Sequence, residues 1–159
     1  MGILTDDMKR VVREQCLAYV ATVCADGTPN LSPKATTTVW DDDHLIFADI
    51  RSPTTRENLL HQPVCEVNVV DPIARKGYRF KGRATVVTAG QRFDEGVAFY
   101  RRNRQLSPIQ AIVFIKVERA LLLTSPAYDV SRTEADVRVE FYEYYDALNR
   151  PKVAVKTLA

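Results

Sequence analysis

Hydroxyl and cationic side chains are concentrated in one short stretch, Arg51-Ser52-Pro53-Thr54-Thr55-Arg56. Ser52 suits the N-cap of a helix, and Pro53 suits the first helical position because the N–H that it lacks would have no partner there. Free N–H groups and the positive end of the helix dipole would then point outward beside Arg51 and Arg56. Such an arrangement holds a phosphate.

The same helix also fits a slightly later start, since Thr54 and Glu57 have the spacing of a capping box. Both registers leave the phosphate hypothesis intact. Its rival is a well-capped surface helix whose two arginines are solvated. Composition alone does not decide between the two interpretations.

Other residues offer little chemistry. The two histidines, His44 and His61, and the three widely spaced cysteines lack the spacing of a zinc site or a Cys–His nucleophile. An odd number of cysteines without a C-x-x-C pair predicts reduced, mostly buried thiols. The acidic run 41–43 is predicted to be a turn rather than a pair of catalytic carboxylates. The sequence therefore identifies no catalytic residue and no metal site.

The composition is that of an ordinary globular protein, with 159 residues and a formal net charge of +2. This charge balance argues against nucleic acid as the main partner. No apolar run approaches the roughly 20 residues that span a bilayer. The N-terminus lacks the pattern of a signal peptide, so a cytoplasmic location is expected. The length predicts one domain over residues 1–159.

Hydrophobic periodicity predicts a mostly β chain with flanking helices. Six antiparallel strands, several of them apolar on both faces, favour closure into a small barrel. Pro33 lacks the N–H of a ladder and predicts an edge strand or a bulge. The expected strands are 17–24, 30–40, 44–49, 64–70, 78–87 and 111–124, and the expected helices are 1–16, 51–62, 90–103 and 133–150, with a loose tail at 151–159.

Two of these helices carry apolar stripes. In the helix at 90–103, the stripe is expected to be buried; in the helix at 133–150, it is expected to be core or dimer contact. The residues of the first stripe are Phe93, Val97 and Tyr100, and those of the second are Val137, Phe141, Tyr144, Tyr145 and Leu148.

Four segments in order resemble the flavin-binding split-barrel proteins related to pyridoxamine 5'-phosphate oxidase: LAYVATVCADGTPNLSPK, DDDHLIFADIRSP, the helix ending in NLLHQP, and VVDPIARKGYRFKGRATVV. The similarity is strongest from Leu17 to Val87 and rests on the order and spacing of the segments. It implies a six-stranded antiparallel split β-barrel, an FMN cofactor, and a homodimer with the flavin at the subunit interface.

The resemblance also implies where FMN would bind. The flavin ring would lie along the strand from Ser32 to Thr37, and its phosphate would be held by the strand end and loop from Ala48 to Thr55. Lys76 would approach the flavin from the partner subunit. The cofactor-binding residues predicted in this way are Ser32, Pro33, Lys34, Ala35, Thr36, Thr37, Ala48, Asp49, Arg51, Ser52, Thr54, Thr55, Arg56 and Lys76.

Lys34 is expected near the pyrimidine edge of the ring, where a cation favours the anionic reduced flavin. A solvated lysine on an edge strand is the alternative. Many relatives carry a lysine near positions 54 and 55 to pair with the phosphate, and this chain has threonines there. Arg51, Arg56 and Lys34 could compensate, since arginine binds phosphate in bidentate fashion.

The function implied is an FMN-dependent oxidoreductase that acts on a small molecule, with NAD(P)H or oxygen as the other partner. No histidine follows His61, so the C-terminus lacks the substrate-binding segment of true pyridoxamine phosphate oxidases, and the vitamin itself is not the expected substrate. The alternatives are a flavin carrier or redox sensor without turnover, a deazaflavin-dependent reductase of the same fold, and a split barrel that has lost FMN.

Overall fold

The structure is a computed structural model that describes residues 2–103 and 107–150. The chain divides into two compact units, and each is described by itself. Unit 1 comprises residues up to 70 together with 77–123, and unit 2 comprises residues 71–76 together with the chain from 124 onward. The elements are α1 (Asp6–Gln15), β1 (Ala18–Val23), β2 (Pro29–Lys34), β3 (Thr38–Val39), β4 (His44–Asp49), α2 (Pro53–His61), β5 (Val64–Asp71), β6 (Lys76–Val87), α3 (Gln91–Arg102), β7 (Ala111–Thr124), the 3-10 helix η1 (Pro126–Val130) and α4 (Glu134–Asn149).

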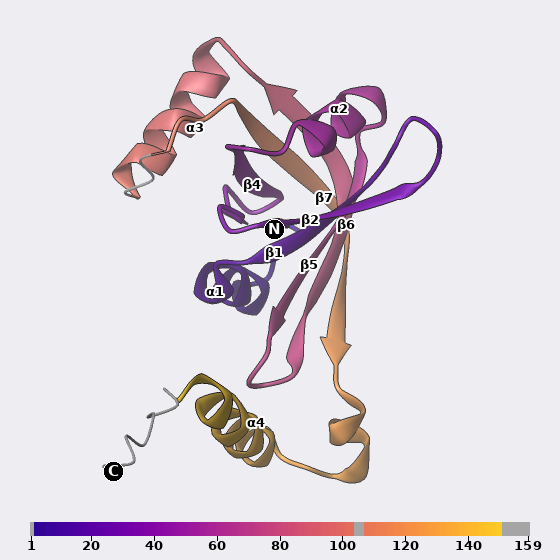
Figure 1. Cartoon of the computed structure of the whole chain (residues 1–159), viewed down its shortest axis with the longest axis vertical. Helices are drawn as coiled ribbons and strands as arrows, with labels where there is room; N and C mark the ends of the chain where they lie inside the picture. Colours follow the sequence, from indigo (N-terminus) through magenta and orange to yellow (C-terminus); the bar gives the residue numbers. More distant parts are fainter. Residues whose placement is uncertain (1, 104–106, 151–159) are drawn as a thin grey trace, which may run out of the picture. The chain divides into compact units, whose positions relative to one another are not determined.

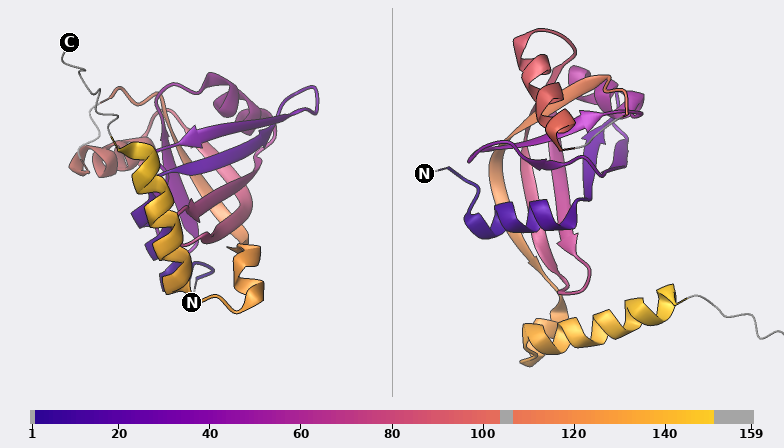
Figure 2. Two further views of the ribbon diagram at one scale, coloured as in Figure 1. Left: turned by 60° about the horizontal axis from the view of Figure 1, so that its bottom comes forward. Right: turned by 90° about the vertical axis from the view of Figure 1, so that its left-hand side faces the viewer.

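The strands form one curled sheet in the order β2-β1-β5-β6-β7-β4-β3 (Figures 1 and 2). The neighbouring strands pair antiparallel, as in β1 with β2 and β4 with β7. This mostly β half-barrel confirms the predicted split-barrel class, and Pro33 lies in an edge strand as expected. The strand count is seven rather than six, because the strand expected at 30–40 is two strands, β2 and β3.

The break between β2 and β3 has a visible cause at Thr36. The β3–β4 register pairs Thr38 with Ile46, so a continued strand would bring Thr36 opposite Ala48. Instead the chain turns, with Thr37 N donating to Lys34 O at 3.3 Å. The Thr36 hydroxyl accepts from Ala48 N at 3.1 Å and donates to Ala48 O at 2.9 Å. A side chain thus replaces the backbone ladder where the strand ends.

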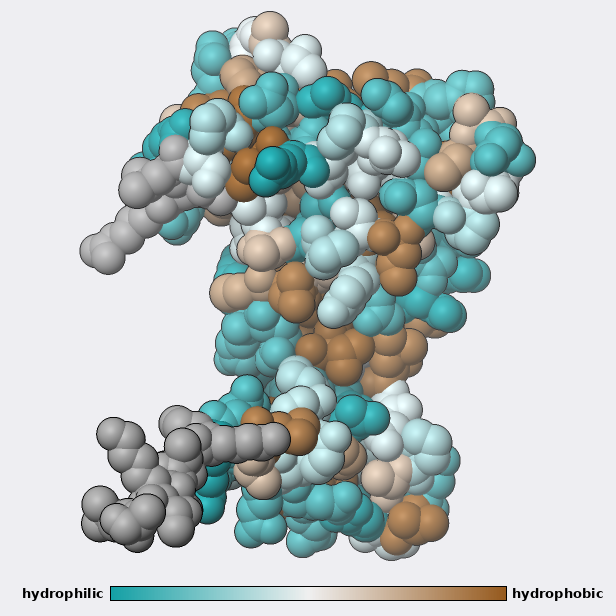
Figure 3. Space-filling model, viewed as in Figure 1, coloured by the Kyte–Doolittle hydropathy of each residue, from teal (hydrophilic) through white to brown (hydrophobic). Residues whose placement is uncertain are grey.

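Two apolar cores lie on opposite faces of β4 and β7. On one face, Val11 and Val12 of α1 pack with inward residues such as Val20, Val67 and Phe80. On the other face, α3 covers Ile46, Ala48, Ile112 and Phe114. These strands are apolar on both faces because α3 covers their outer side. Closure of a barrel alone would not require an apolar outer side. Hydrophilic side chains cover much of the surface seen in Figure 3, with apolar ones exposed in several places.

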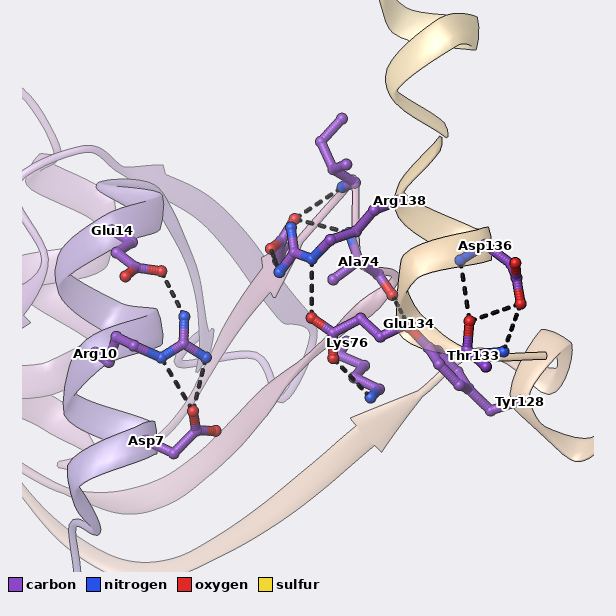
Figure 4. Close-up of polar contacts among 12 residues, drawn as sticks. Asp7, Arg10, Glu14, Ala74, Lys76, Tyr128, Thr133, Glu134, Asp136 and Arg138 are labelled. Carbon is purple, nitrogen blue, oxygen red and sulfur yellow. Dashed lines mark hydrogen bonds and ion pairs between the residues drawn. The ribbon is translucent and has the colours of Figure 1, made fainter. Parts of the chain in front are cut away.

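Unit 2 joins the turn between β5 and β6 to α4 through polar contacts (Figure 4). Asp71 Oδ1 accepts from Ile73 N at 2.8 Å and Ala74 N at 2.9 Å, and its other oxygen pairs with Arg138 at 2.9 Å. The Tyr128 hydroxyl donates to Ala74 O at 2.6 Å. A buried carboxylate therefore both shapes the turn and binds the helix.

The predicted C-terminal helix is confirmed as α4, which begins with a capping box between Thr133 and Asp136. Of its expected apolar stripe, Val137 is buried, whereas Tyr144 and Leu148 are exposed. The expected tail at 151–159 lies outside the described residues. None of the helices in the described ranges is long and apolar enough to cross a membrane.

The three cysteines are free thiols, as predicted. Only Cys65 is buried, and burial raises the pKa of its thiol to about 12. Cys16 is exposed, so the expectation of mostly buried thiols is wrong for this residue. Cys16 is the C-cap of α1 and has the left-handed conformation, at φ 50°.

Gly96 lets α3 lie close to β7, and we expect Gly96→Val to destabilise the protein. A Cβ at this position would lie 2.8 Å from Ile112 Cγ2 and 2.9 Å from Cγ1. Overpacking of this kind costs about 1–3 kcal/mol, which urea denaturation would measure. Ala98→Val, at an exposed position of the same helix, is the control for helix propensity. An equal loss in both variants would contradict the close packing.

Candidate functional site

A cleft of about 700 Å³ opens beside the segment that joins β2 to β3. This volume lies within the range of sites for small molecules. All of its lining residues belong to unit 1. They are Arg13 and Cys16 at the end of α1, residues 35–40, and Phe99, Tyr100 and Asn103 from the end of α3.

Aromatic side chains fix the wall formed by α3. The Tyr100 hydroxyl donates to Thr36 O at 2.8 Å, and burial raises the pKa of this phenol, so it stays a neutral donor. Trp40 packs edge-on against Phe99 and Phe114, with ring centroids 5.6 Å and 5.1 Å apart. The segment after β2 is therefore held between α3 and the end of β4.

Thr37 provides an unsatisfied polar group at the cleft. The residue is only 3% exposed, and its hydroxyl is the one buried side-chain N or O atom without a hydrogen-bond partner among the residues that the structure describes. Buried polar atoms are nearly always bonded, so such an exception calls for an explanation.

A buried cation lies on the other side of the same segment. Lys34 is 4% exposed, so the alternative of a solvated lysine is wrong. Its ammonium group donates to the Ser32 hydroxyl, to Pro33 O at 3.5 Å and to the Thr55 hydroxyl at 3.5 Å, all of them uncharged acceptors. Burial lowers the pKa of Lys34, and the nearby charge of Asp49 opposes that shift.

A polar layer continues from Thr55 between α2 and the first two strands. Asn58 Nδ2 donates to the Thr22 hydroxyl at 3.0 Å and to Cys24 Sγ at 3.4 Å. Asn30 Nδ2 donates to the same Thr22 oxygen at 3.1 Å. These contacts fasten α2 to β1, and β1 to β2.

The start of α2 is occupied by a carboxylate of the chain itself. Asp49, only 1% exposed, accepts a hydrogen bond from Ser52 N at 2.8 Å and pairs with Arg56 Nη1 at 3.1 Å. Ser52 is the N-cap and Pro53 is the first helical residue, as predicted, but the Ser52 side chain makes no capping bond. The sequence predicted free N–H groups here, and Asp49 already uses one of them.

The alternative register for α2, which starts from a capping box at Thr54 and Glu57, is not adopted, because the helix begins at Pro53. Thr54 is exposed, as is Arg51. These two side chains, together with exposed Ala35, lie at the surface of the predicted site. Ala48 is buried at the end of β4.

The structure thus brings most predicted residues together around the end of β4. Residues 35–37 reach the cleft, whereas Ser32, Lys34 and Thr55 form the buried polar layer. Lys76 belongs to unit 2, where it pairs with Glu134 at 2.9 Å and lies 4.2 Å from the Tyr128 ring centroid. Its predicted approach to a partner's flavin stays a prediction.

Sequence reasoning missed the far wall of the cleft, which is formed by Arg13, Cys16, Trp40, Phe99, Tyr100 and Asn103. Tyr100 was expected only in a buried stripe, and the contact between α3 and Thr36 has no local signal. Within residues 2–103 and 107–150, no three His, Cys, Asp or Glu side chains are grouped to hold a metal ion.

Comparisons with known proteins agree with this geometry. The model of the pyridoxamine 5'-phosphate oxidase family matches residues 4–123. HupZ of Group A Streptococcus is 34% identical, with a TM-score of 0.70 over 77% of this chain and 96% of its own. An FMN-binding protein of Syntrophomonas wolfei is 16% identical, with a TM-score of 0.64 over 77% of this chain and 87% of its own. A structure described as an F420 reductase is 17% identical, with a TM-score of 0.59 over 74% and 98% of the two chains. No curated protein sequence matches the chain.

The bridge between Thr36 and Ala48 gives a prediction for stability. Thr36→Val leaves the buried N–H and C=O of Ala48 without this partner, which costs about 1–3 kcal/mol. Thr36→Ser keeps the hydroxyl and should stay close to wild type, and Thr38→Val is the control for the change to valine. Urea denaturation measures all three variants. Equal destabilisation by valine and serine at position 36 would contradict a role for the hydroxyl.

Proposed function

Because this chain belongs to the pyridoxamine 5'-phosphate oxidase family, we propose that it binds a flavin, with FMN as the first candidate, and acts as an oxidoreductase on a small molecule. One observation carries the proposal. The resemblance assigns the flavin ring to the segment from Ser32 to Thr37, and residues 35–37 of that segment line the cleft of about 700 Å³.

The residues of the cleft fit a flat, mostly apolar ring with a polar edge. Trp40, Phe99 and Tyr100 supply aromatic surface, and small sites of this kind combine such surface with a few polar groups. Arg13 and Asn103 supply polar side chains to the same lining.

A bound flavin would supply hydride or electron transfer, which are chemistries that amino-acid side chains lack. Tyr100 would hold the wall through its bond to Thr36 O. The described lining residues include no histidine and no carboxylate, so they offer no conventional general base. The protein's part would be to position the ring and shape the electrostatic field around it.

The structurally similar proteins suggest two candidate cofactors for this chain. One is described as FMN-binding and another as an F420 reductase, and F420 is a deazaflavin. A deazaflavin-dependent reductase is therefore the rival within the same cleft. A flavin carrier without turnover is the second rival, because the described lining residues include no histidine and no carboxylate.

We also propose a homodimer, with the outward face of β1 and β2 as its contact. The register pairs Ala21 with Leu31 and Tyr19 with Pro33, which places these four side chains on one face of the two strands. Tyr19 and Leu31 are 46% and 65% exposed. Exposed apolar patches of this kind mark interaction sites.

Filling the cleft tests the proposed cofactor site. The exposed Ala35→Trp adds a large side chain to the lining without altering the core, so flavin affinity should fall about tenfold or more, which is about 1.4 kcal/mol. Titration of FMN and of a deazaflavin, followed by flavin fluorescence and absorption, measures the loss. Ala25→Trp in the exposed β1–β2 turn is the matched control.

Wild-type protein that binds neither cofactor would overturn the proposed function. Unchanged binding by Ala35→Trp would place the ring outside the cleft. Anaerobic mixing with NADH or NADPH separates an oxidoreductase from a carrier, since a carrier's flavin would stay oxidised while an enzyme's flavin would lose its absorption band.

A charge placed on the proposed dimer face should separate the subunits. We expect Leu31→Glu to weaken the dimer about tenfold or more, because the carboxylate would be desolvated at the contact. Leu60→Glu is the matched control, since Leu60 is also 65% exposed but lies on α2. Sedimentation velocity over a range of concentrations gives the dissociation constant. A wild-type monomer, or a dimer that tolerates Leu31→Glu, would exclude this face.

A further inference from the structure

Three of the donors that the sequence offered to a phosphate, Ser52 N, Arg56 and Lys34, are already used within the chain. Ser52 N and Arg56 Nη1 both bind the Asp49 carboxylate, at 2.8 Å and 3.1 Å. The Lys34 ammonium donates to three uncharged oxygens and is almost fully buried. Of Lys34, Arg51 and Arg56, only Arg51 is exposed.

Asp49 also places a negative charge where the phosphate would come. A phosphate that approached Ser52 N would meet this carboxylate, and like charges at close range cost several kcal/mol in a protein site. Building such a repulsion against one ligand is a general way to obtain specificity. The carboxylate is 1% exposed and held by two partners, so it cannot turn away into water without losing both.

We infer that Asp49 is a specificity-determining residue that excludes a phosphate from the start of α2, so that the protein binds flavins by the ring and treats FMN and riboflavin nearly alike. This inference rests on the proposed function for its ring site. It corrects the role that the resemblance gives to residues 48–55, because here the chain itself supplies the anion.

The wild-type protein gives the first test, without any variant. The dissociation constants of FMN and riboflavin should agree within about threefold, which is less than about 0.7 kcal/mol. FMN that binds more than about tenfold tighter than riboflavin would overturn the inference while leaving the proposed function intact. Failure to bind either flavin would instead count against the proposed function.

Asp49→Asn gives the second test. Asparagine keeps an oxygen for Ser52 N and the size of the side chain, but it removes the negative charge and frees Arg56. The affinity for FMN should then rise about tenfold relative to riboflavin. An unchanged ratio of the two affinities would overturn the inference.

Inorganic phosphate provides a readout that needs no flavin. Phosphate at millimolar concentration should raise the melting temperature of Asp49→Asn and leave that of the wild type unchanged, with chloride at equal ionic strength as the reference. Stabilisation of both proteins alike would overturn the inference, and so would stabilisation of neither.

Asp71→Asn is the matched control. Asp71 is also buried, accepts from two backbone N–H groups and pairs with an arginine, Arg138 at 2.9 Å. It belongs to unit 2, so it reports the general effect of removing a buried carboxylate. If Asp71→Asn gained the same response to phosphate, the effect of Asp49→Asn would not be specific to the start of α2.

Discussion

A carboxylate buried as deeply as that of Asp49 must be compensated where it stands, because the cost of burying an uncompensated charge exceeds the stability of a small domain. Ser52 N and Arg56 provide the compensation. Both partners belong to α2 and its N-cap, so the same contacts fix the first turn of the helix against the end of β4. The position of α2 and the charge of the proposed site therefore have one origin.

The neighbouring residue, Ala48, connects the end of β4 to the segment between β2 and β3. Its N–H and C=O are satisfied by the Thr36 hydroxyl, which lets the chain leave the ladder and turn. That turn places residues 35–37 in the lining of the cleft and Lys34 in the polar layer on the other side. Ala48 and Asp49, the last two residues of β4, thus position both the cleft segment and the start of α2.

The sequence identified the elements well, because their periodicity is a local property. It gave the helix start at Ser52 and Pro53 as one of two registers, and it predicted an edge strand or a bulge at Pro33. It failed at Thr36, where one hydroxyl replaces ladder bonds that hydrophobic pattern treats as continuous. It also could not show that the Asp49 carboxylate accepts a hydrogen bond from Ser52 N, because an aspartate before a helix is equally consistent with a solvated surface charge. The wall from α3 was missed because contacts between distant segments have no local signature.

The site lies almost entirely in unit 1, and the family match ends at residue 123, where unit 1 also ends. The family therefore accounts for the curled sheet, the two cores and the cleft. The charge at the start of α2 depends on one side chain, that of Asp49 at the end of β4. A fold of this kind keeps the backbone near a ligand nearly constant, while one buried carboxylate changes which ligands that backbone accepts. On the inference drawn above, the choice between phosphorylated and unphosphorylated flavins would depend on Asp49 rather than on the architecture that carries it.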